Sequence, residues 1–98
     1  MRYITTVRGT LKDPATAQQV HDATVAAVSP LSRSKGAVSH QPYLNVQNAR
    51  EFLAVDVWNN LESLQELYSD PKLAEEFGKL FEGQPQVTIW SDSGWSQF

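Results

Sequence analysis

The sequence predicts an α+β domain with the element order β-α-β-β-α-β, in which the second helix is broken in two. Three observations predict this order. Alternating segments rich in β-branched residues flank one long amphipathic stretch, a polar turn joins two such segments into a hairpin, and two Asp-Pro pairs mark possible helix starts. The chain has 98 residues, 41% hydrophobic and 19% charged, which is typical of a single globular domain spanning residues 1–98.

The first strand is expected at residues 2–9, where side chains alternate. Asp13-Pro14 then supplies an N-cap and a first-turn proline, so a helix is expected to begin there. One face of this helix is expected to be mainly apolar, because suitable residues recur every three or four positions: Ala17, Val20, Thr24, Ala27, Val28 and Leu31. Pro30 is expected to end or kink the final turn, and Gly36 to close the segment.

Two strands, 37–46 and 51–58, follow and are joined by the polar turn 47–50. Asn59 or Asn60 can then cap a short helix. The buried side of that helix is expected to carry Leu61, Leu64, Leu67 and Tyr68.

Asp70-Pro71 repeats the cap-plus-proline pattern and predicts a second short helix. Its apolar stripe has the strongest helical spacing in the chain and consists of Leu73, Phe77, Leu80 and Phe81. Gly83 and Pro85 are expected to end it, and residues 86–92 to form the last strand. Glu75 and Glu76 are expected to be solvated charges on this helix.

This order predicts a ferredoxin-like antiparallel sheet with the helices on one face. The middle strand nevertheless carries apolar residues on both faces: Leu53, Val55 and Val57 on one side, and Phe52, Ala54 and Trp58 on the other. A sheet with one face in water normally alternates with polar residues. We therefore expect a homodimer through the open sheet face, which would form a dimeric α/β barrel.

Composition excludes several kinds of partner. The net charge of −3 without a Lys/Arg run speaks against nucleic acid and anionic membranes. Cysteine is missing, which excludes thiolate chemistry and fits a cytoplasmic location, and no apolar run reaches the length of a membrane span. The two histidines lie far apart in the sequence without a carboxylate cluster, so no metal site is expected.

The chain resembles the antibiotic biosynthesis monooxygenase (ABM) domain family of the dimeric α/β-barrel superfamily. The resemblance covers nearly the whole chain. It is carried by Gly36 opening the hairpin, by Asp56 two positions before Trp58, and by the Asp-Pro restart of the broken helix. It implies a small homodimer. Characterised members include cofactor-free oxygenases of aromatic polyketides or quinols, and haem-degrading relatives.

The family's catalytic residues carry over poorly. Quinone-forming members place an asparagine four before the tryptophan, a tyrosine six after it and an arginine on the next helix. Here Trp58 matches, but those places hold Ala54, Leu64 and approximately Phe77. Haem-degrading members need an asparagine, a tryptophan and a histidine where this chain has Val7 or Arg8, then Leu67 or Tyr68, then Phe77. The resemblance thus implies the scaffold, without a known catalytic set.

Asp56 and His40 are the candidate catalytic residues. Asp56 is the only acid in residues 52–58, and it is either a general base or a structural carboxylate, the structural role being somewhat favoured. A three-residue loop would pair His40 with Asp56, whereas a two- or four-residue loop would pair Gln41 with Asp56 and turn His40 to the other face. Apolar matching of the two strands favours the second register.

The other candidates are substrate-binding residues. Trp58 either floors a pocket or packs the strand-to-helix turn, and packing is the favoured role. Tyr43 and Tyr68 line a pocket or belong to the core, and His21 lies at the edge of the first helix's stripe, typical of a partly exposed boundary residue. A further aromatic group at the C-terminus is expected to wrap over the subunit or its partner: Trp90, Trp95 and Phe98.

The leading functional hypothesis is a cofactor-independent monooxygenase acting on an electron-rich aromatic molecule bound between sheet and helices. Asp56 or His40 would be the base, Trp58 and Tyr43 would shape the cavity, and neither metal nor other cofactor would be needed. Two alternatives stay open: a non-catalytic ligand-binding or stress-associated module, and a polyketide cyclase or isomerase on the same scaffold.

Overall fold

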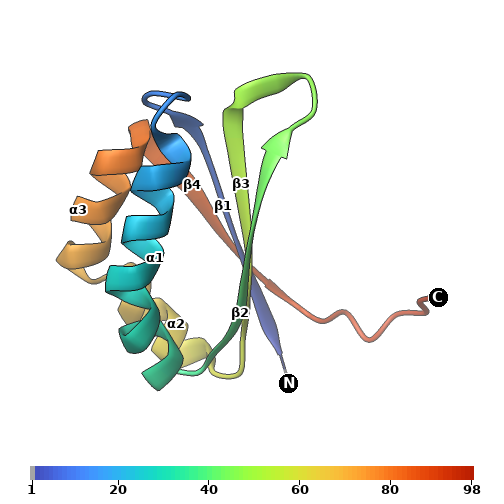
Figure 1. Cartoon of the computed structure of the whole chain (residues 1–98). Coiled ribbons are helices and arrows are strands. Elements are labelled where there is room, and N and C mark those ends of the chain that lie inside the picture. The colour runs from blue at the N-terminus through green and yellow to red at the C-terminus, as the bar shows by residue number, and fades with distance from the viewer. Residues whose placement is uncertain (1) are drawn as a thin grey trace.

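The computed structural model describes residues 2–98 and contains a four-stranded antiparallel sheet with helices packed against one side (Figure 1). The strands are β1 (Tyr3–Leu11), β2 (Ala37–Asn45), β3 (Asn48–Trp58) and β4 (Phe81–Ser91), in the spatial order β2-β3-β1-β4. The helices are α1 (Ala17–Ser34), α2 (Leu61–Tyr68) and α3 (Pro71–Leu80). This arrangement confirms the predicted α+β, ferredoxin-like fold. Among these helices, none has the length and apolar character needed to cross a membrane.

The two central strands determine which residues face the helices. Thr5 of β1 lies opposite Asp56 of β3, and Val7 lies opposite Ala54. Because side chains alternate along a strand, these positions and Trp58 share the helix-facing side of the sheet. Thr5 is fully buried, and Val7, Ala54 and Trp58 are each at most 3% exposed.

The core consists of two clusters at opposite ends of the helix-facing side. The first contains Val7, Leu11, Phe52, Ala54, Leu80 and Phe81. The second contains Trp58, Leu64, Leu67 and Leu73. Tyr68 and Phe77 pack against both clusters, so the broken helix joins the two halves of the core.

The break between α2 and α3 is built as the sequence predicts. The side chain of Asn60 accepts a hydrogen bond from the Ser63 amide at 3.0 Å and caps α2. The side chain of Asp70 accepts from the Lys72 amide at 2.9 Å, and Pro71 is the first residue of α3. Each cap satisfies an amide that has no partner inside its helix.

The first Asp-Pro pair, Asp13-Pro14, does not start a helix as expected. Asp13 accepts hydrogen bonds from the Ala15 amide at 3.0 Å and the Thr16 hydroxyl at 3.3 Å, which forms a turn, and α1 begins only at Ala17. Of the two effects expected of Pro30, a helix end and a kink, the first is wrong, because α1 continues to Ser34. A proline removes only one amide donor, and later amides still find carbonyl partners: that of Lys35 donates to the Leu31 carbonyl.

The last strand begins five residues earlier than predicted, at Phe81 rather than at residue 86. Phe81 pairs with Leu11 and is 2% exposed, so it continues the buried side of α3 as a strand residue. Gly83 and Pro85 lie inside β4, where the pairing with β1 shifts register between Arg8 and Thr10. A strand tolerates proline at such an irregularity because no ladder hydrogen bond is required there.

The structure also corrects the expectation for Glu76, which is buried rather than solvated. Its carboxylate accepts from Lys79 at 3.1 Å and from the Thr24 hydroxyl at 3.3 Å, which connects α3 to α1. The hydrogen bond from Lys79 lowers the pKa of Glu76, so the charge remains compensated where the two helices meet.

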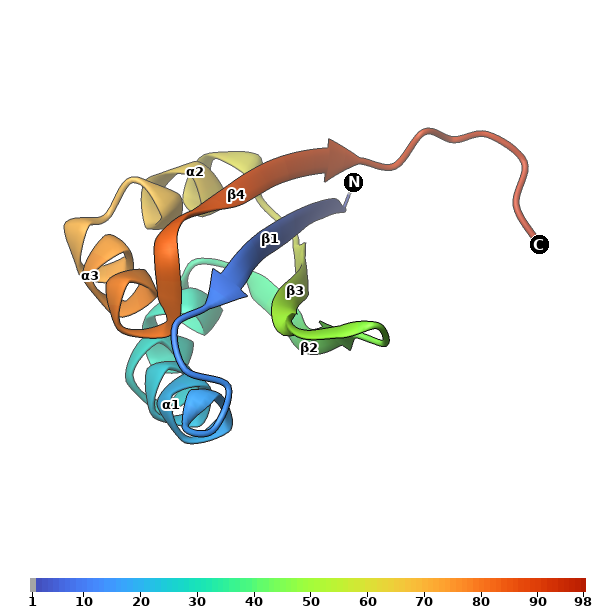
Figure 2. The ribbon, with the colours of Figure 1, turned by 90° about the horizontal axis from the view of Figure 1, so that it is seen from above.

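The aromatic C-terminus does not pack over its own domain. Beyond β4 the chain leads away from the sheet (Figures 1 and 2), leaving Trp95 83% exposed and Phe98 among the most exposed side chains. Trp90, on the last strand, donates a hydrogen bond from Nε1 to the Thr6 hydroxyl at 3.0 Å.

The close approach of β1 to β4 gives a stability prediction. A Cβ on Gly9 would lie 2.6 Å from Cδ1 of Phe81, a ring held in place by Phe52 and Phe77. We expect Gly9→Ala to lower the free energy of unfolding by about 1–3 kcal/mol, as overpacked cores do. Urea denaturation measures this change.

The matched control is Gly78→Ala in α3, where a Cβ would meet nothing within 4 Å. It should raise the free energy of unfolding by about 0.5–1 kcal/mol, because alanine restricts the unfolded chain and favours helix. Equal stabilities of the two variants would contradict the packing described for β1 and β4.

Candidate functional site

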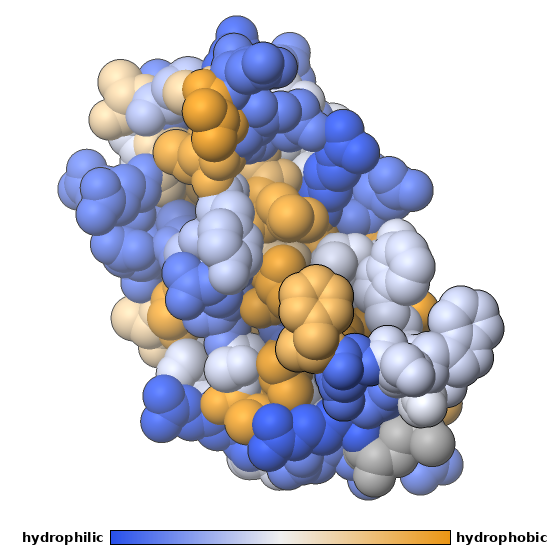
Figure 3. Space-filling view, turned by 90° about the vertical axis from the view of Figure 1, so that its right-hand side faces the viewer, coloured by the Kyte–Doolittle hydropathy of each residue, from blue (hydrophilic) through white to orange (hydrophobic). Residues whose placement is uncertain are grey.

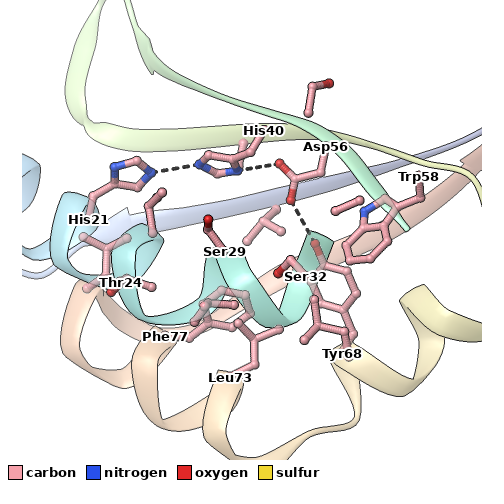
Figure 4. Close-up of a pocket in the computed structure, with 18 of the residues that line it drawn as sticks. His21, Thr24, Ser29, Ser32, His40, Asp56, Trp58, Tyr68, Leu73 and Phe77 are labelled. Carbon is pink, nitrogen blue, oxygen red and sulfur yellow. Dashed lines mark hydrogen bonds and ion pairs between the residues drawn. The ribbon is translucent and has the colours of Figure 1, made fainter. Parts of the chain in front are cut away.

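A cavity of about 260 Å³ lies between the helix-facing side of the sheet and the three helices (Figure 4). Most of its wall is apolar, including Val7, Val25, Val28, Phe52, Ala54, Leu73 and Phe77. Its polar side chains are His21, Thr24, Ser29, Ser32, Arg33, Ser39, His40, Asp56 and Tyr68. An apolar hollow with a few convergent polar groups is typical of a small-molecule site.

Asp56 and His40 meet in this cavity. Nδ1 of His40 lies 2.6 Å from Oδ1 of Asp56, and the two residues are paired across β2 and β3. The side chain of Asp56 is 14% exposed and that of His40 is 36% exposed. The sequence reasoning favoured the other register, which would have separated them, and this preference is wrong.

The hairpin explains the error. Its turn is short, because Asn45 pairs directly with Asn48, but a shift in register between Leu44 and Asn45 moves the rest of β2 along β3. Leu44 is 56% exposed and Val46 is fully exposed, so neither takes part in the apolar matching that favoured the other register. A bulge of this kind leaves no clear signal in a turn sequence.

The pKa of His40 is raised from its ordinary value by its hydrogen bond to Asp56 and by the carboxylate's charge, while burial acts in the opposite direction. An imidazolium is therefore stabilised next to the carboxylate. In return, Asp56 has a compensating partner for a charge that would be costly in a largely apolar cavity.

Asp56 receives a second set of donors from the other side. The Tyr68 hydroxyl donates to Oδ2 of Asp56 at 3.1 Å and lies 2.9 Å from the hydroxyl of Thr5. Nε1 of Trp58 donates to the same Thr5 hydroxyl at 3.2 Å. Because the indole can only donate and an ionised carboxylate can only accept, the hydrogen bonds run from Trp58 through Thr5 and Tyr68 to Asp56.

This arrangement gives Trp58 and Tyr68 defined roles. Trp58 is 1% exposed and packs in the core, as favoured from the sequence, but it also lines the cavity and orients Thr5. Burial and the nearby Asp56 charge raise the pKa of Tyr68, so its phenol remains a neutral donor to the carboxylate.

His21 extends the network toward the surface. Its Nε2 atom lies 2.9 Å from Nε2 of His40, and its Nδ1 atom lies 3.0 Å from Oδ1 of Asp22 (Figure 4 shows the first of these contacts). The ring also packs against Phe52, with centroids 5.6 Å apart. The side chain is 14% exposed and the residue is of intermediate burial, so His21 is the partly exposed residue expected from the sequence and also lines the cavity.

Tyr43 is the one predicted site residue that the structure keeps away from the cavity. It pairs with Leu53 on β3 and so lies on the open face of the sheet, with 51% of its surface exposed. Conversely, sequence reasoning missed Thr5 and Asp22. Thr5 lies two positions before Val7 and therefore on the same buried face of β1. This spacing is the one sequence signal that could have indicated Thr5.

The chemistry available is proton transfer at a carboxylate–imidazole pair next to an apolar space. In residues 2–98 no group of three or more His, Cys, Asp or Glu residues is arranged to hold a metal ion. The two histidines use one ring nitrogen each for a carboxylate and one for each other.

Comparison with solved structures identifies the fold. SnoaB, a cofactor-independent oxygenase from Streptomyces nogalater, matches with a TM-score of 0.73 at 17% identity over 93% of this chain and 92% of its own. A monooxygenase from the gene ActVA-Orf6 of Streptomyces coelicolor, in complex with nanaomycin D, matches with a TM-score of 0.72 at 16% identity over 97% and 90%.

A protein from Bordetella bronchiseptica, provisionally described as an antibiotic biosynthesis monooxygenase, matches with a TM-score of 0.71 at 17% identity over 93% of this chain and 96% of its own. No protein-family model and no curated protein sequence matches the chain. The chain therefore has the fold of the ABM proteins, as its resemblance implied, at sequence identities that establish the fold alone.

The internal hydrogen bonds predict the effect of Tyr68→Phe. This change removes the donor to Asp56 and leaves the fully buried Thr5 hydroxyl without its acceptor. We expect a loss of about 1–3 kcal/mol in the free energy of unfolding, measured by urea denaturation. Tyr43→Phe removes a hydroxyl from the exposed face and serves as the control. A similar loss in both variants would argue against the network.

The raised pKa of His40 predicts a pH dependence of stability. A group whose pKa is raised on folding stabilises the protein below its ordinary pKa of 6.5, and this contribution disappears as pH rises through the folded value. The stability difference between wild type and His40→Gln should therefore be largest near pH 5 and shrink toward about pH 9. Urea denaturation across this range tests it, and a constant difference would contradict the ion pair.

Proposed function

We propose that the protein is a cofactor-independent monooxygenase that oxidises an electron-rich aromatic molecule of the quinol or polyketide type. The observation that carries the proposal is the Asp56–His40 pair opening into an apolar cavity. The fold supports it, because SnoaB is a cofactor-independent oxygenase and the ActVA-Orf6 monooxygenase holds nanaomycin D.

Asp56 acts as the base in this reaction. It accepts a proton from the substrate's phenol or from the carbon next to its carbonyl, and the resulting anion passes one electron to O₂. Recombination of the two radicals forms a carbon–oxygen bond, and the protonated peroxide loses water to leave one oxygen atom in the product. The substrate anion is itself the reductant, so the protein must supply a base, an enclosed apolar space and orientation.

The other cavity residues bind and orient the substrate. Trp58, Phe52 and Phe77 offer flat apolar surfaces, and Tyr68 holds the carboxylate in position. The volume of about 260 Å³ is just below the range of ~300–1,000 Å³ for drug-sized ligands, which favours aromatic substrates of one to three rings.

A polyketide cyclase or isomerase is the second candidate, because the same pair can abstract a proton without any use of oxygen. Its specific support is that the positions at which the family resemblance would put the oxygenases' asparagine and tyrosine hold Ala54 and Leu64, and Leu64 is fully buried in the core. Reaction under ¹⁸O₂ separates the two: label in the product excludes the cyclase, and rearranged product without label excludes the oxygenase.

Oxygen consumption by purified, metal-stripped protein tests the leading proposal. The substrates are a panel of hydroquinones, dihydroxynaphthalenes and anthrones, with heat-denatured protein as background. We expect Asp56→Asn to lower kcat/KM by about 10²–10⁴-fold, as loss of a general base does, and His40→Gln to lower it less. Asp92→Asn, outside the cavity, is the charge-matched control.

Unchanged turnover in a protein carrying both Asp56→Asn and His40→Ala would exclude the proposed base. Ligand-dependent quenching of tryptophan fluorescence without oxygen uptake would instead support a non-catalytic binding module, since Trp58 lines the cavity.

We further propose that two copies associate through the open sheet face, as the sequence led us to expect. A band of hydrophobic side chains crosses this face between hydrophilic borders (Figure 3). The strand registers place Ile4, Leu53, Val55, Val57 and Trp90 on it. A contiguous apolar patch on a sheet is typical of an interface, and pairing with a second copy would bury it.

Sedimentation velocity at micromolar concentration tests the dimer. Val55→Asp should give a monomer, because it places a charge at the centre of the patch. Val46→Asp is the control, since Val46 is fully exposed in the hairpin turn. A wild-type protein that sediments only as a monomer would contradict this proposal without affecting the cavity chemistry.

A further inference from the structure

Two histidines 19 positions apart in sequence face each other inside the site, each with a carboxylate behind it. Asp22 lies against Nδ1 of His21, Asp56 lies against Nδ1 of His40, and the two Nε2 atoms are 2.9 Å apart. We propose that His21 and His40 hold one shared proton as a single cationic pair, which links the cavity carboxylate Asp56 to the surface carboxylate Asp22. Its catalytic consequence rests on the proposed function.

The proposal follows from counting protons on the four ring nitrogens. An ionised carboxylate only accepts, so both Nδ1 atoms must carry a proton to make their bonds. The contact between the two Nε2 atoms needs one further proton. Three protons on two imidazoles are one more than two neutral rings carry, so the pair has a charge of +1 when all three bonds are made.

The surroundings favour this charge. Asp22 and Arg33 come from α1, Asp56 from β3, and Tyr68 from α2, where its hydroxyl donates to Asp56. From α3, Glu76 contacts Thr24, one turn beyond His21. Two carboxylates thus touch the pair directly, while Arg33 is the one cationic side chain among the cavity-lining residues.

The side-chain exposures show where the pair reaches solvent. Asp56 and His21 are each 14% exposed, His40 is 36% exposed, and Asp22 is 63% exposed at the surface. The pair can therefore exchange its proton with solvent at His40 and, through His21, at Asp22.

During the proposed reaction, Asp56 becomes neutral when it accepts the substrate's proton. The shared charge on the two histidines then lies beside the new substrate anion and stabilises it. No covalent bond to either histidine is formed or broken except those to the shared proton. In this scheme His21 does not abstract the substrate's proton; it is a positioning residue that acts through His40.

Nitrogen-detected NMR of the intact, metal-free protein tests the pair directly, since imidazole ¹⁵N shifts distinguish a nitrogen that carries a proton from one that does not. We expect both Nδ1 atoms to be protonated at pH 7. We also expect the His40 ring to report two titration steps, because a proton shared with a second imidazole couples the two rings. His21→Gln should leave a single step at His40.

Asp22→Asn gives the sharper result, because Asp22 contacts His21 and makes no hydrogen bond to His40. Loss of its charge should lower the pKa observed at His40 through the shared proton. Asp92→Asn removes the same charge elsewhere and should leave His40 unchanged. A single-step titration of His40 in the wild type, or a His40 titration unaffected by Asp22→Asn and His21→Gln, would overturn the proposal.

The outcome is separable from that of the proposed function. Coupled titrations in a protein that consumes no oxygen with any substrate would retain the pair and reject the oxygenase. If oxygen is consumed, His21→Gln should shift the pH profile of kcat, and a uniform loss at every pH would argue against the shared charge.

Discussion

The candidate site depends on the carboxylate of Asp56. It lies in the middle of the sheet's helix-facing side, and a largely apolar cavity is a poor environment for its charge. The protein compensates with donors on both sides: an imidazole on the neighbouring strand and a phenol on α2, which is itself positioned by Thr5 and Trp58. Strand register, helix position and the core tryptophan are therefore all coupled through one side chain.

Local rules predicted most of the fold. The Asn60 and Asp70 caps and the alternation of β1 and β3 are properties of short segments, so the sequence indicates them directly. The errors have a different origin. Phe81 fits a helical stripe equally well, and only its pairing with Leu11 makes it a strand residue. Glu76 is buried because Thr24 and Lys79 approach it, which no local pattern reveals.

The site was harder to predict for the same reason. Asp56, Trp58, His40 and Tyr68 could be selected as chemically competent residues, but their meeting depends on a bulge that shifts β2 along β3. That shift brings His40 to the cavity and places Tyr43 on the opposite face, so one local irregularity decides two assignments. The contact of His21 with His40 joins a helix to a strand and has no counterpart in sequence spacing.

This chain shares its fold with the ABM proteins, but its cavity carries its own set of polar residues. The fold is that of the ABM proteins, and the places at which the family resemblance would put an asparagine and a tyrosine hold Ala54 and Leu64, which are both buried. The polar groups of this cavity lie on the β2–β3 pair and on the facing side of α1, where an acid and two imidazoles share one hydrogen-bonded chain. A sheet covered by helices on one face needs only a cavity between the layers to host a site, and any strand position that faces this cavity can carry the base. A carboxylate can therefore be charged at this point of the architecture when it finds donors on both sides, as Asp56 does in His40 and Tyr68.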